Sequence, residues 1–193
     1  GCILVEGYGL TEASPLVAAN PLNENRRSGS IGLAAPGTTI GFRDLEDLTR
    51  DAPEGEKGEL VVSGPQIMAG YYNRPEETAR ALEGGVLHTG DVGYRDADGF
   101  IYLVDRIKDL ILCSGYNVYP RVIEEAIYQH PSVEEVIVIA IPDTYRGQAP
   151  KAFVKLREGA ELTADELKTF LKDHLSAIER PQEIEFRDSL PTT

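Results

Sequence analysis

The sequence predicts an α+β fold in two parts, and three observations indicate it. Up to about residue 107, short apolar runs alternate with turns rich in Gly and Pro, which is typical of short strands. After residue 107, amphipathic helical segments alternate with apolar runs of strand length. With 41% hydrophobic residues in 193, the chain can bury a core. We therefore expect a β-rich first part over residues 1–107 and a small α+β domain over 108–193.

The first part contains the predicted short strands and one helix. Residues 3–5 predict a buried strand that leads into a Gly-punctuated turn at 7–9. Residues 20–64 carry short β-branched runs between turns, so an irregular β-unit is expected. Pro75 and the acids after it predict a short helix over 74–82. Asp and Gly at 96–99 then predict a hairpin turn between two strands.

The second part reads as helices alternating with strands. Pro120 suits the first turn of a helix over 120–129, whose apolar residues fall on one face. Thr163 and Glu166 form a capping box and predict a second helix. Strands are predicted over residues 133–141, 151–156 and 183–186.

Charge and composition exclude several classes of function. The formal net charge is −13, so no basic stripe is available for nucleic acid or an anionic membrane surface. No run of eighteen apolar residues predicts a transmembrane helix. Cys2 and Cys113 lack the spacing of a zinc site, so we expect them to be reduced thiols that act as small apolar residues in a cytoplasmic protein.

Residues 7–12 combine two turn glycines with side chains that suit a nucleotide. Tyr8 can stack on a base, Thr11 can donate to a phosphate oxygen, and Glu12 can bind Mg²⁺. By spacing alone, however, a Gly-rich turn with a capping Thr is the favoured interpretation. The segment matches neither the dinucleotide fingerprint nor the P-loop.

Three further positions carry charged groups beside predicted strands. Asp91, expected at a tight turn, could accept two ribose hydroxyls, although alone it is more readily a structural turn residue. Arg106 and Lys108 are cations that would attract phosphate, or simply part of a solvated linker. Gly115 permits another unusual backbone turn after them.

Four motifs in this order resemble the adenylate-forming superfamily of acyl-CoA synthetases. They are Gly7-Tyr8-Gly9-Leu10-Thr11-Glu12, Gly58-Glu59-Leu60 through Gly70-Tyr71-Tyr72 to Pro75-Glu76-Glu77-Thr78, His88-Thr89-Gly90-Asp91, and Asp105-Arg106-Ile107-Lys108-Asp109 through Gly115-Tyr116-Asn117-Val118-Tyr119-Pro120. The resemblance covers the whole chain. The stretch from Glu6 to Val17, followed by Asn20-Pro21 and Gly29-Ser30-Ile31-Gly32, looks most like the long-chain fatty acyl-CoA synthetase branch.

The resemblance implies a two-step ligase reaction with ATP, Mg²⁺ and CoA. A carboxylate, most readily a fatty acid, would attack the α-phosphate of ATP to give acyl-AMP and pyrophosphate. The thiolate of CoA would then displace AMP and form the thioester. Residues 1–107 would be the end of the large AMP-binding domain, and 108–193 the mobile C-terminal domain.

The resemblance also implies a role for individual residues. Thr11 and Glu12 would be the catalytic pair, with Thr11 on the α-phosphate and Glu12 on Mg²⁺. The remaining roles would be Tyr8 along the adenine, Asp91 and Arg106 on the ribose hydroxyls, Asn117 on the adenylate, Lys108 as the hinge, and Gly115 and Tyr116 along the path of the CoA pantetheine.

Two parts of the family's pattern are not found in the 193 residues. The phosphate loop would precede Gly1, and the catalytic Lys would follow the stretch that begins at Leu190-Pro191. We therefore expect a C-terminal segment of a longer enzyme that is inactive alone, because cationic stabilisation of the transition state is often the largest catalytic term. Two alternatives stay open: an adenylation module that loads a carrier protein, and a non-catalytic nucleotide-binding or interaction domain. The sequence does not specify the oligomeric state.

Overall fold

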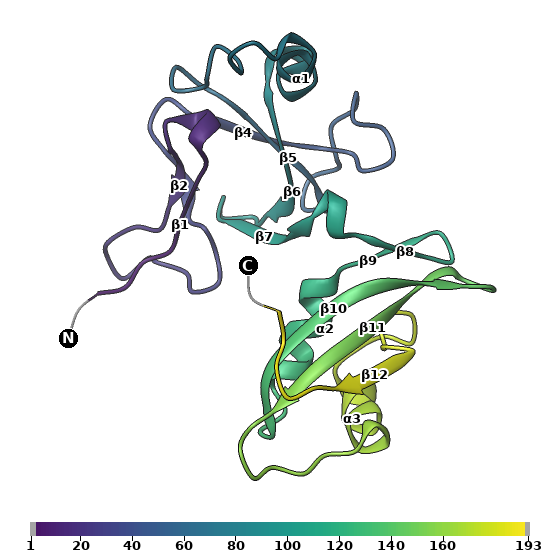
Figure 1. Cartoon of the computed structure of the whole chain (residues 1–193). Helices are drawn as coiled ribbons and strands as arrows, with labels where there is room; N and C mark the ends of the chain where they lie inside the picture. The colour runs from purple at the N-terminus through teal and green to yellow at the C-terminus, as the bar shows by residue number, and fades with distance from the viewer. Residues whose placement is uncertain (1–2, 192–193) are drawn as a thin grey trace. The chain divides into compact units, whose positions relative to one another are not determined.

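The computed structural model describes residues 3–191 and contains two compact units, Gly1–Ile107 and Lys108–Thr193 (Figure 1). Cys2 lies outside the described residues. Cys113 is buried with a free thiol, in agreement with its expected place among small apolar residues. No helix within residues 3–191 is long and apolar enough to cross a membrane.

A three-stranded antiparallel sheet opens the first unit, in the order β1-β2-β3. Its strands are β1 (Gly7–Gly9), β2 (Leu16–Ala19) and β3 (Leu33–Ala34), and a 3₁₀ turn, Thr11–Ala13, joins the first two. The expected strand at 3–5 is wrong, because no described strand pairs with it and Leu4 is 88% exposed. The strand begins instead at Gly7, within the expected turn.

A four-stranded antiparallel sheet follows, in the order β4-β5-β6-β7. The strands are β4 (Thr39–Arg43), β5 (Gly58–Ser63), β6 (Leu87–Arg95) and β7 (Ile101–Arg106). The predicted hairpin around 96–99 is confirmed as the β6–β7 connection. The predicted helix is confirmed as α1 (Pro75–Ala81), with Pro75 in its first turn, followed by a 3₁₀ turn at Glu83–Gly85.

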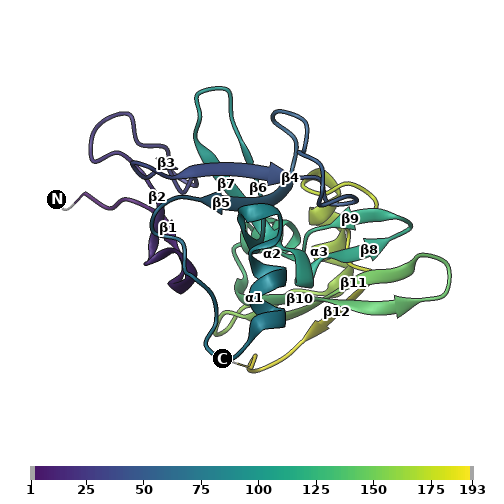
Figure 2. The same ribbon diagram turned by 90° about the horizontal axis from the view of Figure 1, so that it is seen from above.

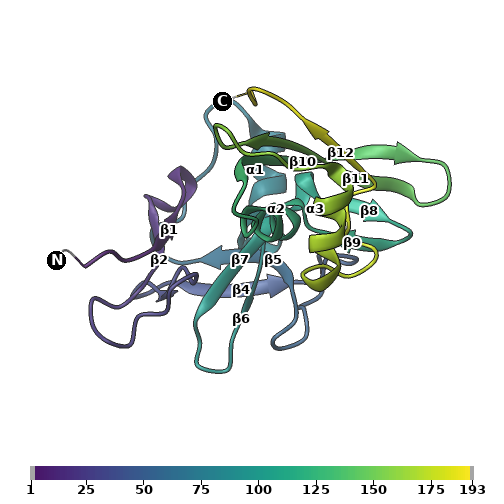
Figure 3. The same cartoon turned by 90° about the horizontal axis from the view of Figure 1, so that it is seen from below.

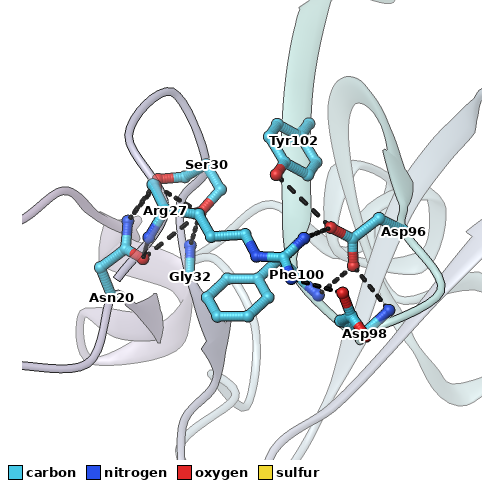
Figure 4. A network of polar contacts seen from close by, with 8 residues as sticks. All are labelled: Asn20, Arg27, Ser30, Gly32, Asp96, Asp98, Phe100 and Tyr102. Atoms are coloured by element: carbon cyan, nitrogen blue, oxygen red, sulfur yellow. Dashed lines mark hydrogen bonds and ion pairs between the residues drawn. The ribbon is translucent and has the colours of Figure 1, made fainter. Parts of the chain in front are cut away.

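A polar network ties the two sheets of the first unit together (Figure 4). Arg27 forms ion pairs with Asp96 and Asp98 at the β6–β7 turn, and its guanidinium lies 4.6 Å from the ring centroid of Phe100. The buried amide of Asn20 donates to the carbonyl of Arg27 at 3.0 Å and accepts the Arg27 amide at 3.0 Å. The loop that follows β2 is thus fastened to the second sheet.

The second unit is a five-stranded sheet with two helices. Its path is β10-β11-β8-β9, and β12 pairs in parallel with β11. The strands are β8 (Ile111–Cys113), β9 (Tyr116–Val118), β10 (Val133–Asp143), β11 (Gly147–Leu156) and β12 (Glu183–Phe186). Figures 2 and 3 show the long β10–β11 ribbon with β12 beside β11 from two further sides.

Both predicted helices of the second unit are confirmed, as α2 (Pro120–Tyr128) and α3 (Ala164–Phe170), the latter followed by a 3₁₀ turn at Leu171–Asp173. Ile123 and Ile127 from α2 and Leu167 from α3 are fully buried in one core with Val136 and alternating residues of the sheet. The predicted strands over 133–141, 151–156 and 183–186 are also confirmed. The short β8–β9 hairpin was not predicted as strands; only its turn was.

Candidate functional site

Three of the predicted site residues meet in the first unit although they are far apart in sequence. The hydroxyl of Tyr8, on β1, donates to Oδ2 of Asp91, on β6, at 2.5 Å. Nε of Arg106, at the end of β7, donates to Oδ1 of the same carboxylate at 3.0 Å. Asp91 is paired with Arg106 in the β6–β7 ladder, so the antiparallel register places the two side chains together.

The cluster of Tyr8, Asp91 and Arg106 extends from the protein interior to the solvent. Asp91 is buried, at 8% exposure, whereas the side chain of Arg106 is 57% exposed. Burial raises the pKa of the Tyr8 phenol, and the hydrogen bond and negative charge of Asp91 raise this pKa further. Tyr8 therefore stays a neutral donor to Asp91, which also accepts the hydrogen bond of Arg106.

Asp91 lies on a β-bulge inside a strand, which corrects the expectation of a tight turn after a strand. The register between β5 and β6 shifts between Glu59 and Val61, and Gly90 has φ +73°. A non-glycine residue would be strained at that φ, so glycine suits the bulge. The sequence alone could not distinguish a tight turn from a bulge, because a glycine with positive φ suits both.

Thr11 and Glu12 lie together on the 3₁₀ turn between β1 and β2. Thr11 is exposed, and Oε1 of Glu12 accepts the hydroxyl of Tyr71 at 2.8 Å. That hydrogen bond, followed by burial and the charge of Glu12, raises the pKa of Tyr71. The backbone amide of Met68 also donates to the Glu12 carbonyl at 2.8 Å.

Tyr71 is a site residue that the sequence reasoning did not assign. It belongs to the quoted Gly70-Tyr71-Tyr72 motif, and its backbone amide donates to Oγ1 of Thr78 at 2.9 Å. Gly70 next to it has φ +145°, and a Cβ there would lie 2.6 Å from Cγ2 of Thr78. The motif's glycine was therefore a signal of close backbone packing that brings Tyr71 to Glu12.

The donor set around Glu12 fits a magnesium ion that is shared with a phosphate substrate. Within residues 3–191, no three His, Cys, Asp or Glu side chains cluster as a self-contained metal site. Oε2 of Glu12 has no hydrogen-bond partner among the described residues. Mg²⁺ in phosphate-transfer sites commonly takes one or two carboxylates together with substrate phosphates and water, so a single carboxylate oxygen at Glu12 is adequate.

The other four predicted residues belong to the second unit. Lys108 is exposed in the 3₁₀ turn Ile107–Asp109, at the first position of that unit. Gly115 (φ +81°) lies in the β8–β9 turn, and the exposed Tyr116 and the half-buried Asn117 follow it on β9. Gly115, Tyr116 and Asn117 thus belong to one hairpin, and Lys108 lies on the segment that leads into it.

The second unit also has a basic pocket that no motif indicated. It has a volume of about 490 Å³, and its lining includes four cationic side chains against one carboxylate, that of Asp143. The cations are Arg146, Lys168, Lys172 and Arg180. They come from three separate stretches of an acidic chain, so their clustering is visible only in the fold.

Two family profiles match the chain. The profile described as AMP-binding enzyme matches residues 1–72, and the profile described as AMP-binding enzyme C-terminal domain matches residues 122–193. A long-chain-fatty-acid–CoA ligase of Bacillus subtilis (strain 168) is 48% identical over 190 residues, which are 98% of this chain and 34% of that protein. A feruloyl-CoA synthase of an Amycolatopsis species is 41% identical over 100% of this chain and 39% of its own length.

Solved structures give the same result. ATP-bound MatB from Rhodopseudomonas palustris superimposes with a TM-score of 0.92 at 33% identity, over 100% of this chain and 38% of that one. This chain spans about a third of the length of the curated relatives it matches. Matches to both parts of one family, in the order that the motifs follow, show that the chain belongs to the adenylate-forming AMP-binding enzymes.

Proposed function

We propose that this chain is the nucleotide-binding part of an ATP-dependent acyl-CoA ligase that activates a fatty acid. The observation that carries the proposal is the convergence of Tyr8 and Arg106 on the buried carboxylate of Asp91. In the first step, a substrate carboxylate oxygen attacks the α-phosphorus of ATP and pyrophosphate leaves. In the second, the CoA thiolate attacks the acyl carbonyl carbon, and AMP leaves as the thioester forms.

Asp91 is suited to hold the ribose. An ionised carboxylate has about four acceptor positions, and Tyr8 and Arg106 each use one in this structure. Two ribose hydroxyls can therefore donate to Asp91 without displacing either partner. The half-buried ring of Tyr8 offers a flat apolar surface for the adenine.

Thr11 and Glu12 would act at the phosphates. The Thr11 hydroxyl is exposed and free to donate to an α-phosphate oxygen, where negative charge builds up as pyrophosphate leaves. Glu12 would hold Mg²⁺, which supplies charge neutralisation of the phosphates when bound. Tyr71 fixes one oxygen of Glu12, so the other is directed to the ion.

We assign residues 1–107 to the end of the large AMP-binding domain and 108–193 to the mobile C-terminal domain, with Lys108 as the hinge. Each unit has a hydrophobic core of its own, which supports this division. Gly115 and Tyr116 would line the pantetheine path, and Asn117 would contact the adenylate. A polypeptide of residues 108–193 should unfold in one cooperative transition; a spectrum without native β-structure would contradict the division.

The basic pocket of the second unit supports CoA as the thiol substrate. CoA carries phosphates, and four cations that surround a 490 Å³ hollow can pair with them. Arg146→Ala and Lys172→Ala should each weaken CoA binding about two- to fivefold, as expected for the loss of a solvent-exposed ion pair worth up to about 1 kcal/mol. Lys155→Ala is the matched control, because Lys155 pairs with Glu134 and Glu135 and does not line this pocket.

The acid is proposed to be a fatty acid because of the 48% identity to the Bacillus subtilis ligase. ATP and CoA are intracellular metabolites, so the proposed function implies that the protein acts in the cytoplasm. Pyrophosphate release by the longer enzyme that contains this chain, measured with fatty and aromatic acids, would test the substrate. Faster turnover of a hydroxycinnamate would contradict it.

The nucleotide site is tested by binding AMP and 2′,3′-dideoxy-AMP to the 193-residue chain. AMP should shift the resonances of Tyr8, Asp91 and Arg106, and the dideoxy compound should bind at least about tenfold more weakly, because it cannot donate to Asp91. Asp91→Asn should reduce this discrimination. Asp98→Asn is the control, because Asp98 is an exposed carboxylate of the same unit that pairs with Arg27. Equal affinity for the two nucleotides would rule out the assignment of Asp91.

A further inference from the structure

Glu59 is a buried carboxylate that the proposed function does not use. It lies on β5 and is 3% exposed, and it is one of the few charged side chains inside the first unit. Burial of an ionised carboxylate is unfavourable unless hydrogen bonds satisfy it. The partners that satisfy Glu59 therefore indicate what it does.

Both carboxylate oxygens of Glu59 have a separate partner on β6. Oε1 accepts the backbone amide of Gly90 at 3.0 Å. Oε2 lies 2.7 Å from Nδ1 of His88, whose side chain is 15% exposed. Because an ionised carboxylate only accepts hydrogen bonds, Nδ1 of His88 carries the proton in this contact.

Gly90 lies in the bulge that ends at Asp91, and His88 is the ladder residue just before that bulge. Where a bulge interrupts a ladder, backbone groups lose their cross-strand partners and need others. Glu59 supplies the partner for Gly90, and Thr89 supplies two more contacts: its hydroxyl donates to the Leu60 carbonyl at 2.7 Å and accepts the Asp91 amide at 3.1 Å. Side chains, rather than ladder hydrogen bonds, thus hold the backbone just before Asp91.

We propose that Glu59 and His88 are positioning residues that lock the bulge in one geometry and so aim the Asp91 carboxylate at the ribose hydroxyls of the nucleotide. The inference rests on the proposed function for the identity of the ligand. The contacts of Glu59 with His88 and with the Gly90 amide, which we call the clamp, are a property of the folded chain and do not depend on the ligand. His88 occupies the second oxygen of Glu59 and keeps the first one on Gly90.

Paired variants separate the effect of losing the clamp from a general loss of stability. Glu59→Leu removes both contacts, whereas Glu59→Gln keeps an acceptor for the Gly90 amide. His88→Leu removes the donor, whereas His88→Asn restores an N–H at the position of Nδ1. Val92→Ala is the matched control, because Val92 is fully buried on the same strand next to Asp91 and contributes nothing to the clamp.

Hydrogen exchange of the Gly90 amide in the 193-residue chain reports the clamp directly. In Glu59→Leu this exchange should accelerate at least about tenfold beyond the change in Val92→Ala, and Glu59→Gln should restore most of the protection. The pKa of the Tyr8 phenol should fall in Glu59→Leu, because a misplaced Asp91 no longer accepts its hydrogen. Affinity for AMP should fall about tenfold in Glu59→Leu and His88→Leu and recover in His88→Asn.

The clamp is overturned if Glu59→Leu matches Val92→Ala in Gly90 exchange and in the titration of Tyr8. If both of these change while AMP affinity does not, the clamp exists but does not position the nucleotide, and the inference is again wrong. A wild-type chain that binds no AMP would count against the proposed function instead. The exchange and titration measurements would still decide whether Glu59 and His88 fix the bulge.

Discussion

At the residue scale, the carboxylate of Asp91 governs the ionisation of Tyr8. Burial, then the hydrogen bond to Asp91 and its charge, raise the pKa of the phenol above the ordinary value of 10.0. Asp91→Asn removes the charge but leaves the ring buried. The pKa of Tyr8 should therefore fall toward 10.0 without reaching it, so that tyrosinate forms at a lower pH than in the wild type.

Titration of the tyrosine ring resonances by NMR measures this shift. Tyr71 is the internal control, because its raised pKa comes from a hydrogen bond to Glu12. Its titration should not move in Asp91→Asn. An unchanged pKa of Tyr8 would show that burial alone holds the proton.

Two glycines of the first unit allow backbone strain to be separated from a steric clash. Gly32 has φ +88°, and a Cβ there would lie 2.1 Å from the Ala19 carbonyl carbon. Gly55 has φ +80°, and nothing lies within 4 Å of its Cβ position. Gly55→Ala should lower the free energy of unfolding by about 1–2 kcal/mol, from the left-handed backbone alone. Gly32→Ala should lower it by about 3 kcal/mol or more, because backbone atoms must also move.

Denaturant unfolding of both variants measures the difference. Equal losses of stability would mean that the chain near Ala19 moves away without resistance. That result would contradict the close packing of the loop at Gly32 against the end of β2.

Some of the site could be predicted from the sequence, and the reason lies in how each residue is placed. Thr11 and Glu12 are neighbours in sequence, so their shared turn is local. Tyr8 and Asp91 are 83 positions apart, and only the order of whole motifs suggested that they serve one site. The Glu59–His88 contact could not be foreseen, because it depends on a register shift between two strands.

At the element scale, the capping box of α3 gives a direct test of helix-end energetics. Oγ1 of Thr163 accepts the Glu166 amide at 3.3 Å, and Oε2 of Glu166 accepts the Thr163 amide at 2.8 Å. Thr163→Ala should lower the free energy of unfolding by about 1 kcal/mol, because the first turn loses its cap. Thr169→Ala is the matched control: Thr169 lies within the same helix, where Ala is the better helix former, so stability should be equal or higher.

Thermal unfolding of the two variants checks this prediction. A loss of stability in Thr169→Ala as large as that in Thr163→Ala would contradict the capping argument. It would mean instead that either threonine contributes through packing.

The length of an element and the signals at its ends explain which elements could be predicted from the sequence. α2, α3, β10 and β11 have long patterns or explicit end signals, and the sequence predicts all four. β8 and β9 have three residues each, too few to show a period, and Leu112 on β8 is exposed. At residues 3–5 the apolar pattern alone was misleading, because a strand also needs a neighbour to pair with.

At the scale of the whole molecule, net charge and local charge act in opposite directions. The chain carries −13, which repels ATP and CoA at long range. Under the proposed function, recognition of ATP and CoA would therefore come from short-range groups: Arg106 beside Asp91, the magnesium that Glu12 would hold, and the four cations of the basic pocket. Long-range repulsion is screened over about 8 Å at physiological ionic strength, so these groups can dominate at contact.

Catalysis requires more than these groups provide, and we predict that the 193-residue chain binds AMP but does not adenylate. As charge develops on the α-phosphate, a fixed cation is often the largest source of stabilisation. The resemblance places that cation on a lysine, and places the phosphate loop on a Ser/Thr/Gly-rich stretch, that the printed sequence does not contain. With ATP, Mg²⁺, CoA and a fatty acid, pyrophosphate release should not exceed that of a protein-free reaction. The Bacillus subtilis long-chain-fatty-acid–CoA ligase, assayed alongside, is the positive control. Release that requires both the chain and the acid would show that Thr11, Glu12 and Arg106 suffice for the first step.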